Sequence, residues 1–348
     1  MRIGIYTDMH CSFTSSILPL TCKNSNYTYR LQMIIDTFKW MYDVFDKANV
    51  DFIVNCGDLF DSYRLRAEEV SAMAEALSYS RGLKEFHIIG NHELLDSQRH
   101  FYATALLSNY SNIEVIDQPT KLSGGISLLP YMTSDDAAEI LPYITNDILF
   151  SHLDIYGSRV TANHILENGV SVSQLQNLFN VVINGHIHAY QKLADGVYNI
   201  GASSSLSFSD DNDYTPSICV FNTESHRITR FDNLNVPIFI KCQLLTESDI
   251  AVFKDTYINK LTKYIVRCDT THEFRSSIES IMNNASNIIC YRIRTADNAH
   301  TTDEPIANIE LNSDVDNEFD KFLRVTSELK YPLNDYMCVL SDLQEVKQ

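Results

Sequence analysis

"VVINGHIHAY", residues 181–190, joins an apolar run of β-forming residues to a glycine and two histidines. The apolar run is typical of a buried strand, and Gly185 allows a sharp turn where that strand ends. His186 and His188 stand at alternate positions, so they are either an accident of a sheet edge or half of a metal site. The choice depends on whether the rest of the chain supplies more ligands.

Four other segments place polar side chains directly after a predicted strand. They are Asp8-Met9-His10, "GDLFD" at Gly57–Asp61, "GNHE" at Gly90–Glu93, and His152 after "DILFS". Open α/β sheets bind ligands at the carboxyl ends of their strands. We therefore expect these segments and "GHIH" at 185–188 to meet at one edge of the fold.

Each segment also has an ordinary explanation when it is taken alone. Asp8 and His10 fit a turn carboxylate beside a surface imidazole, and His152 fits a hydrogen-bonded, half-buried histidine. Asp61 fits a helix cap, because aspartate is a favoured N-cap residue. Five such segments in this order, each closing a predicted strand, are hard to obtain by chance, so a shared site is the better interpretation.

The residue types indicate which ions suit this site. Aspartate, asparagine and histidine offer oxygen and nitrogen ligands without a thiolate, a set that suits Mn²⁺, Mg²⁺ or Fe²⁺ better than structural zinc. Two such ions about 3.5–4 Å apart clamp a phosphate, and a carboxylate must bridge them to offset their repulsion. The sequence therefore predicts two divalent metal ions, with Mn²⁺ as the first choice and Mg²⁺ or Fe²⁺ as alternatives.

The composition is that of a globular protein. The chain has 348 residues, of which 45% are hydrophobic, enough for one large domain and a smaller one. No apolar stretch reaches the length of a membrane span, and the N-terminus lacks the apolar core of a signal peptide. Eight cysteines are scattered singly, which fits thiols kept reduced. We therefore expect a soluble, cytoplasmic protein.

The net charge of −18 argues against a protein that grips nucleic acid unaided, because duplex binding normally uses a basic surface. Residues 301–348 hold 11 Asp/Glu against 4 Lys/Arg, so −7 of this charge lies in the tail. Bound divalent cations would offset part of the remainder locally. Charge alone therefore leaves the partner open.

The order of apolar patterns predicts an α/β fold. Helical spacing favours helices at 29–46 and 67–80, which alternate with strands at "RIGIYTD", 52–56 and 86–89. Such alternation packs helices against a sheet. Further strands are expected at 113–116, 126–129, 147–151, 180–184, 197–200, 217–222 and 226–231, with a short helix near 134–141 and a long loop at 11–27. Because the later strands mostly follow one another without helices, the second half should be mixed or antiparallel.

The pattern changes after "NVPIF" at 235–239. The strand patterns "IFIKCQLL", "YIVRCD" and "IICYRIRT" alternate with expected helices at 248–262 and 271–284, which indicates a small separate α/β unit. A polar linker follows, and then a tail in which apolar residues at helical spacing predict a helix at about 315–330. The expected division of the chain is 1–238, 239–300 and 301–348.

The five segments resemble the motif set of the calcineurin-like metallophosphoesterase superfamily: D-x-H, G-D-x-x-D, G-N-H-[ED], a lone H and G-H-x-H. The resemblance covers about residues 1–230 and implies an α/β/β/α sandwich with two metal ions. Carried over position by position, it implies one ion held by Asp8, His10 and His188, another held by Asn91, His152 and His186, and Asp58 as the bridge.

The histidine of G-N-H is not a metal ligand in this superfamily. The resemblance implies that His92 contacts the phosphate or protonates the leaving oxygen, with Asp61 as the partner that orients and charges it. A structural hydrogen bond within the turn is the ordinary alternative for His92.

Details of the motifs distinguish branches of the superfamily. Asp61 is followed by Ser62-Tyr63, whereas the protein phosphatases continue with Arg-Gly. "GDLFDS" and "VYNIGASSSLSFSD" at 197–210 are instead similar to the SbcD-type DNA repair and recombination nucleases, including those of phages. Ser151 is a departure, because a glycine often precedes the lone histidine. The long loop at 11–27 and the acidity are others.

The SbcD-type resemblance implies a DNA exonuclease or endonuclease that works as a subunit with an SbcC-type coiled-coil ATPase. Residues 1–238 would form the nuclease domain and 239–300 a capping domain that helps to place DNA over the metals. The acidic tail would supply a docking helix for the partner, and packing of this helix on its own domain is the equally good alternative. A homodimer within a heterotetramer, in the cytoplasm of a bacterial or phage-infected host cell, is the expected assembly.

Two other functions stay open. One is a phosphodiesterase or phosphatase of the same fold that acts on small substrates. The other is a metallophosphoesterase fold kept only as a scaffold subunit, which complete motifs argue against.

Overall fold

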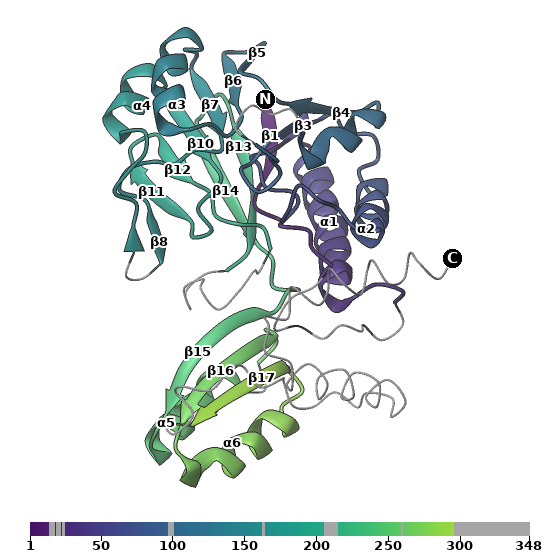
Figure 1. Cartoon of the computed structure of the whole chain (residues 1–348), viewed down its shortest axis with the longest axis vertical. Coiled ribbons are helices and arrows are strands. Elements are labelled where there is room, and N and C mark those ends of the chain that lie inside the picture. The colour runs from purple at the N-terminus through teal and green to yellow at the C-terminus, as the bar shows by residue number, and fades with distance from the viewer. Residues whose placement is uncertain are drawn as a thin grey trace, which may run out of the picture. The chain divides into compact units, whose positions relative to one another are not determined.

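The computed structural model describes residues 1–13, 18, 22, 25–96, 101–161, 164–204, 215–258 and 260–295. Two six-stranded sheets are stacked face to face, with helices on both outer sides (Figure 1). Helices α1 (Tyr29–Ala48) and α2 (Ala67–Ser78) cover one side, and α3 (Ser134–Ile140) and α4 (Val172–Leu178) cover the other. The expected α/β class and α/β/β/α sandwich are confirmed. The tail at 301–348, including the helix expected there, lies outside the described residues.

The first sheet has the strand order β14-β13-β1-β2-β3-β4. Its strands are β1 (Arg2–Tyr6), β2 (Phe52–Asn55), β3 (Glu85–Ile88), β4 (Ile113–Ile116), β13 (Ser217–Asn222) and β14 (Arg227–Asp232). Strands β1 to β4 run parallel, as their helical or looped crossovers require. Strands β13 and β14 form a hairpin that adds to β1 in antiparallel fashion.

The second sheet has the strand order β11-β12-β10-β7-β6-β5. Its strands are β5 (Thr120–Leu122), β6 (Ile126–Leu129), β7 (Ile148–Ser151), β10 (Val181–Asn184), β11 (Gln191–Ala194) and β12 (Val197–Asn199). The four central strands are parallel and the two edge strands are antiparallel, so the expected mixed character of the second half is present. The connections also contain the short elements η1 (Ala103–Asn109), η2 (Leu141–Tyr143), β8 (Arg159–Thr161) and β9 (His164–Ile165).

The central strands are apolar on both faces because both faces are buried. In β10, Val181 and Ile183 point into the core between the sheets, whereas Val182 joins the core beneath α3 and α4. Full burial of each such side chain contributes about 1.5–3 kcal/mol. Continuous apolar runs of this kind are expected for parallel strands covered on both sides.

A three-stranded parallel sheet follows the hairpin. It consists of β15 (Ile238–Leu244), β16 (Tyr264–Thr270) and β17 (Ile288–Thr295), with α5 (Glu247–Tyr257) and α6 (His272–Asn284) between them in sequence. Thr246 caps α5 by accepting a hydrogen bond from Asp249 N–H. The helix expected at 248–262 ends at Tyr257, because Ile258 is already extended. The division of the chain at 238 and 300 stays a prediction.

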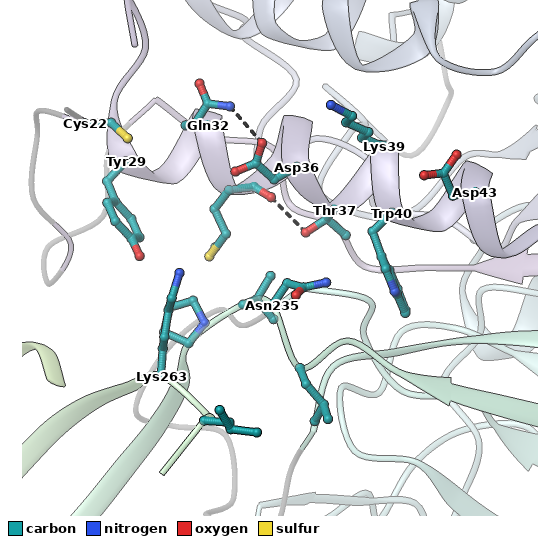
Figure 2. Close-up of a pocket in the computed structure, with 15 residues that line it drawn as sticks. Cys22, Tyr29, Gln32, Asp36, Thr37, Lys39, Trp40, Asp43, Asn235 and Lys263 are labelled. Carbon is teal, nitrogen blue, oxygen red and sulfur yellow. Dashed lines mark hydrogen bonds between the residues drawn. The ribbon is translucent and has the colours of Figure 1, made fainter. Parts of the chain in front are cut away.

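The two faces of this small sheet bury different partners. Val266 of β16 packs with the helices α5 and α6, whereas Ile265 joins Met33 of α1 and Val236. Met33 and Val236 also line a groove of about 580 Å³ between α1 and the chain that leads from β14 to β15 (Figure 2). The lone Trp40 lies on the α1 wall and Lys263 lies opposite. The small sheet is thus attached to α1 by shared apolar packing.

Two sequence-based expectations concern the chain as a whole. Within the described ranges, no helix combines the length and the apolar character needed to cross a membrane. The seven cysteines within those ranges are free thiols.

Candidate metal centre

The five polar segments follow strands whose carboxyl ends meet at one edge of the sandwich. Asp8–His10 follow β1, Gly57–Asp61 follow β2 and Gly90–Glu93 follow β3, which are parallel neighbours in the first sheet. His152 follows β7 and Gly185–His188 follow β10, which are parallel neighbours in the second. The structure thus brings the candidate residues of both sheets together.

Hydrogen bonds between the segments fix their loops. Asp8 N–H donates to Gly57 O and His10 N–H donates to Asp58 O, each at 3.0 Å. His186 N–H donates to Asp8 Oδ2 at 3.1 Å, which ties the second sheet to the first. Asp8, His10, Asp58 and His186 all have a positive φ, between 44° and 68°. Such backbone costs about 1–3 kcal/mol at a residue other than glycine, so the surrounding structure holds these residues against their local preference.

Two motif glycines make room for the cluster. Gly57 has a φ of +104°, and a Cβ there would overlap Nδ1 of His152. At Gly90, a Cβ would overlap both the Oδ1 atom and the backbone nitrogen of Asp58. Close packing against the candidate ligands therefore explains both glycines, and the left-handed turn is needed only at Gly57.

The first group of donor atoms belongs to Asp8, His10 and His188. Asp8 Oδ1 lies 3.7 Å from His10 Nε2 and 4.0 Å from His188 Nε2. The three donor atoms lie within 4.8 Å of one another, which is close enough to share one ion. Asp8 and His10 are buried, whereas His188 is partly exposed.

The second group belongs to Asn91, His152 and His186. His152 Nε2 lies 3.1 Å from Asn91 Oδ1, and His186 Nδ1 lies 3.0 Å from the same oxygen. Asp58 Oδ2 lies 3.2 Å from His152 Nε2 and 3.8 Å from His10 Nε2 of the first group. Asp58 therefore stands between the two groups, where a bridging carboxylate is needed.

Two buried atoms of the cluster lack the partners that proteins normally provide. Within the part of the chain that the structure describes, neither Asp8 Oδ1 nor His10 Nε2 has a hydrogen-bond partner. A buried polar atom left unsatisfied costs about 1–3 kcal/mol. A cation would supply the missing interaction, since two bonds of about 2.1 Å reach atoms that are 3.7 Å apart. The residues present therefore fit a pair of divalent ions.

The outer nitrogens of two histidines are oriented as metal ligands require. His10 Nδ1 lies 3.1 Å from Asp61 Oδ1, and His152 Nδ1 lies 2.7 Å from Cys56 O. Both oxygens accept hydrogen bonds, so Nδ1 is the protonated nitrogen of the neutral ring and Nε2 faces the cluster. Metal-binding histidines usually have such an outer partner.

His92 and Asp61 lie at the mouth of the cluster. Their side chains are 44% and 49% exposed, whereas that of Asp58 is 2% exposed. His92 N–H donates to Asp58 Oδ1 at 3.0 Å, and its Nδ1 lies 3.2 Å from Asp61 O. A carbonyl oxygen can only accept, so Nδ1 donates to it and Nε2 is the nitrogen that can reach a substrate.

Asp61 has a second partner that the sequence does not indicate. Its Oδ1 atom lies 3.1 Å from His10 Nδ1 and 3.8 Å from His92 Nδ1. The carboxylate therefore contacts a candidate ligand more closely than it contacts the candidate acid. The expected role of Asp61 toward His92 stays a prediction.

Residues 1–190 match the family model described as calcineurin-like phosphoesterase. The chain belongs to this family. Membership confirms the resemblance drawn from the motifs, and it implies a metal-dependent phosphoester hydrolase with divalent ions at a site of this kind.

Several relatives of this phosphoesterase extend beyond the aligned region. The chain is 28% identical over 204 residues to exonuclease subunit 1 of Enterobacteria phage T4, covering 56% of this chain and 59% of that one. It is 22% identical over 231 residues to putative phosphoesterase 078R of Invertebrate iridescent virus 3, covering 62% and 63%. An archaeal phosphodiesterase structure matches at 14% identity with a TM-score of 0.36, over 67% of this chain and 100% of that one. The chain thus spans about three fifths of the curated relatives' length.

The phosphoesterase site is electrostatically balanced by its own histidines. Burial disfavours the charge of Asp58, but His152 outweighs burial and holds the pKa of that carboxyl below its usual range. Burial lowers the pKa of His10, but the hydrogen bond to Asp61 and the nearby carboxylates of Asp8 and Asp58 outweigh burial and raise that pKa to about 10. Burial is likewise outweighed at His152, where Asp58 raises the pKa to about 9. Positive charge on these histidines thus compensates the buried carboxylates, as divalent ions would.

Two further residues brace the phosphoesterase site, and the sequence assigns no separate role to either. Arg30 of α1 is buried and donates to the carbonyl oxygens of residues 9–10 at 3.1 and 3.0 Å. Glu93 is fully buried, and its carboxylate accepts hydrogen bonds from Phe60 N–H at 3.1 Å and Gly90 N–H at 2.9 Å. Glu93 is visible as the last letter of "GNHE". Arg30 gives only a weak signal, a basic residue on the buried face of a helix.

Proposed function

We propose that this phosphoesterase is a metal-dependent DNA nuclease that hydrolyses phosphodiester bonds. The observation that carries the proposal is the position of Asp58 between two groups of donor atoms, because a two-ion site suits in-line displacement at a phosphodiester. The ligands in this proposal are Asp8, His10, Asp58, Asn91, His152, His186 and His188.

Ions bound there would lower the pKa of a water nucleophile and neutralise charge on the phosphate. The protein's own residues then have separate tasks. The buried ligands fix the position of the phosphate, and His92 at the mouth faces the leaving oxygen. The oxygen of a water molecule adds to phosphorus and the water loses a proton to solvent, while one ester P–O bond breaks. His92 gives a proton to the departing oxygen and then recovers one from solvent. We propose that Asp61 orients the His92 ring, because its carboxylate lies 3.8 Å from His92 Nδ1.

Similarity to exonuclease subunit 1 of phage T4 supports DNA as the substrate. The name of that relative also supports a multi-subunit enzyme. We propose an SbcC-type coiled-coil ATPase as the partner, in a heterotetramer that contains two copies of this chain. Such a partner would supply phosphate contacts, which a chain with a net charge of −18 is poorly suited to provide alone. Mn²⁺ is the proposed metal, and the cytoplasm of a bacterial or phage-infected cell is the proposed location.

A small phosphodiester or phosphomonoester is the second candidate substrate. The relatives in two invertebrate iridescent viruses are named only as putative phosphoesterases, which supports this alternative. A scaffold function is disfavoured, because every candidate ligand is present and the donor atoms converge.

The test compares substrates with and without metal. Purified protein is incubated with Mn²⁺ and with linear duplex, hairpin DNA, supercoiled plasmid, bis-p-nitrophenyl phosphate or p-nitrophenyl phosphate. We expect cleavage of DNA and of the diester, and no cleavage after chelation. Hydrolysis of either p-nitrophenyl ester without cleavage of DNA would favour the second candidate. Absence of all hydrolysis with Mn²⁺, Mg²⁺ or Fe²⁺, with the ATPase present, would refute the proposal.

A further inference from the structure

Asp154 lies outside the five motifs, and its side chain contacts a candidate ligand. Its Oδ1 atom lies 2.9 Å from Nε2 of His186. The two side chains are 29% and 19% exposed, so the contact is largely shielded from water. Asp154 follows His152 by two positions and is not a residue of any of the five motifs.

The other nitrogen of His186 faces the second group of donor atoms. His186 Nδ1 lies 3.0 Å from Asn91 Oδ1 and 3.3 Å from His152 Nε2. An ionised carboxylate only accepts hydrogen bonds, so Asp154 requires the proton of a neutral His186 ring to be on Nε2. The lone pair is then on Nδ1 and points toward the donor group. This is the opposite tautomer from that of His10 and His152.

The backbone around Asp154 is held by the strand that carries His186. Asn184, the last residue of β10, accepts from Leu153 N–H and donates through Nδ2 to Leu153 O, each at 2.9 Å. On the other side, Val170 N–H donates to Asp154 O at 2.9 Å. The backbone that carries the Asp154 carboxylate is therefore tied to β10 on one side and to Val170 on the other.

We propose that Asp154 is a positioning residue that holds His186 as an Nδ1 ligand of one of the two ions. The inference rests on the proposed metal centre. His152, in the same group, has the neutral carbonyl of Cys56 as its outer partner among the described residues. Asp154 is thus the carboxylate that supports this group, as Asp61 supports His10 in the other. A carboxylate on the outer nitrogen fixes the ring and increases its basicity toward the metal.

The expected effect is selective. Loss of an outer partner typically weakens metal affinity roughly 10–100-fold. We expect Asp154→Ala to weaken one of two Mn²⁺ sites by this factor and to leave the other site unchanged. The affinity of the same site in Asp154→Asn should lie between those of the wild type and Asp154→Ala, because the amide oxygen still accepts a hydrogen bond but carries no charge.

Isothermal titration of the metal-free full chain with Mn²⁺ measures both sites, and the electron paramagnetic resonance signal separates single ions from coupled pairs. Asp195→Asn is the matched control, because Asp195 pairs with Lys192 on the surface and its side chain is 96% exposed. At Mn²⁺ levels that saturate the wild type, Asp154→Ala should show isolated Mn²⁺ in place of coupled pairs. In a His186→Ala background, Asp154→Ala should have no further effect on affinity.

The outcomes distinguish this inference from the proposed function. If the wild type binds two Mn²⁺ ions and both Asp154 variants bind them with the same affinities, Asp154 is not a positioning residue. Equal weakening of both sites, or an undiminished effect in the His186→Ala background, also overturns the inference, because it would indicate general damage. If Asp154→Ala does not fold, the same criteria apply to Asp154→Asn. A wild type that binds fewer than two ions refutes the metal centre itself, and this inference with it.

Discussion

Replacement of His92 by alanine should separate chemistry from metal binding. The contact that joins His92 to the ligand set is a backbone hydrogen bond, from its N–H to Asp58 Oδ1 at 3.0 Å. Alanine keeps this bond, so Asp58 should keep its position. The side chain that is removed lies at the mouth. It forms a third close group with His10 and Asp61, apart from the two donor groups that contain the proposed ligands. His92→Ala should therefore still bind two Mn²⁺ ions.

The expected losses in reaction rate and in folding stability can be estimated separately. A general acid–base group typically contributes 10²–10⁴-fold in rate, or about 2.7–5.4 kcal/mol in activation free energy. Folding should change by less than about 1 kcal/mol, because the ring is 44% exposed and its packing is mainly an edge contact with His10. We expect kcat to fall within that range while thermal unfolding barely changes.

The assay compares two leaving groups. A sugar alkoxide needs a proton as it departs, whereas p-nitrophenolate is a stable anion. His92→Ala should therefore lose much more activity on DNA than on bis-p-nitrophenyl phosphate. His164→Ala is the control, because His164 is an exposed histidine on β9. Equal losses on both substrates would indicate a phosphate contact instead of an acid. Loss of Mn²⁺ in calorimetry would mean that His92 is a ligand and that the proposed assignment is wrong.

Four further outcomes follow from the same geometry. Asp58→Asn should abolish hydrolysis and weaken metal binding in a folded protein, and unchanged Mn²⁺-dependent turnover would exclude a bridging role. Gly90→Ala should destabilise the fold by about 1–3 kcal/mol in thermal unfolding and weaken Mn²⁺ binding, because the new Cβ overlaps Asp58. The pKa values of His10 and His152 are raised to about 10 and 9, so Mn²⁺ must displace protons from these rings when it binds. The affinity for Mn²⁺ should therefore rise with pH across pH 6–9. Calorimetry in buffers of different ionisation enthalpy would detect the protons that are released. Asp61→Asn should weaken Mn²⁺ binding and also lower kcat, which titration and kinetics would measure separately.

The sequence predicts the central strands and long helices of the fold well, because burial shapes their residue pattern. In β7 and β10 every residue is buried, and the resulting apolar run is unambiguous. The edge strand β11, "QKLA", and the short helix α4, "VSQLQNL", are absent from the prediction. Both are short; α4 buries only Leu175 and β11 buries none of its residues, so neither contains enough buried positions to show a period. Their structure depends on neighbours that are distant in sequence.

The same distinction applies to the site. Motifs reveal the candidate ligands because each motif is local, a strand end followed by a polar turn. Residues that act on the ligands from elsewhere carry no such signal. Arg30 reaches the 9–10 turn from a helix, and Asp154 reaches His186 across 32 positions of the chain. Their contribution depends on how two sheets are packed together, which the local pattern does not contain.

The burial of each side chain explains why some substitutions should change metal affinity and others only the rate of hydrolysis. Atoms of Asp8, His10 and Asp58 are buried, so removal of one charge leaves another without compensation, and metal affinity must change. The His92 side chain is half exposed, so water can fill the space that the ring leaves when it is removed, and no buried charge loses its partner. Asp61 is the residue where these two regimes meet, since one carboxylate contacts the outer nitrogen of His10 and lies 3.8 Å from His92. Because the same charge would support a metal ligand and a proton donor, a defect in metal binding and a defect in proton transfer should occur together in Asp61→Asn, whereas His92→Ala should lose proton transfer alone.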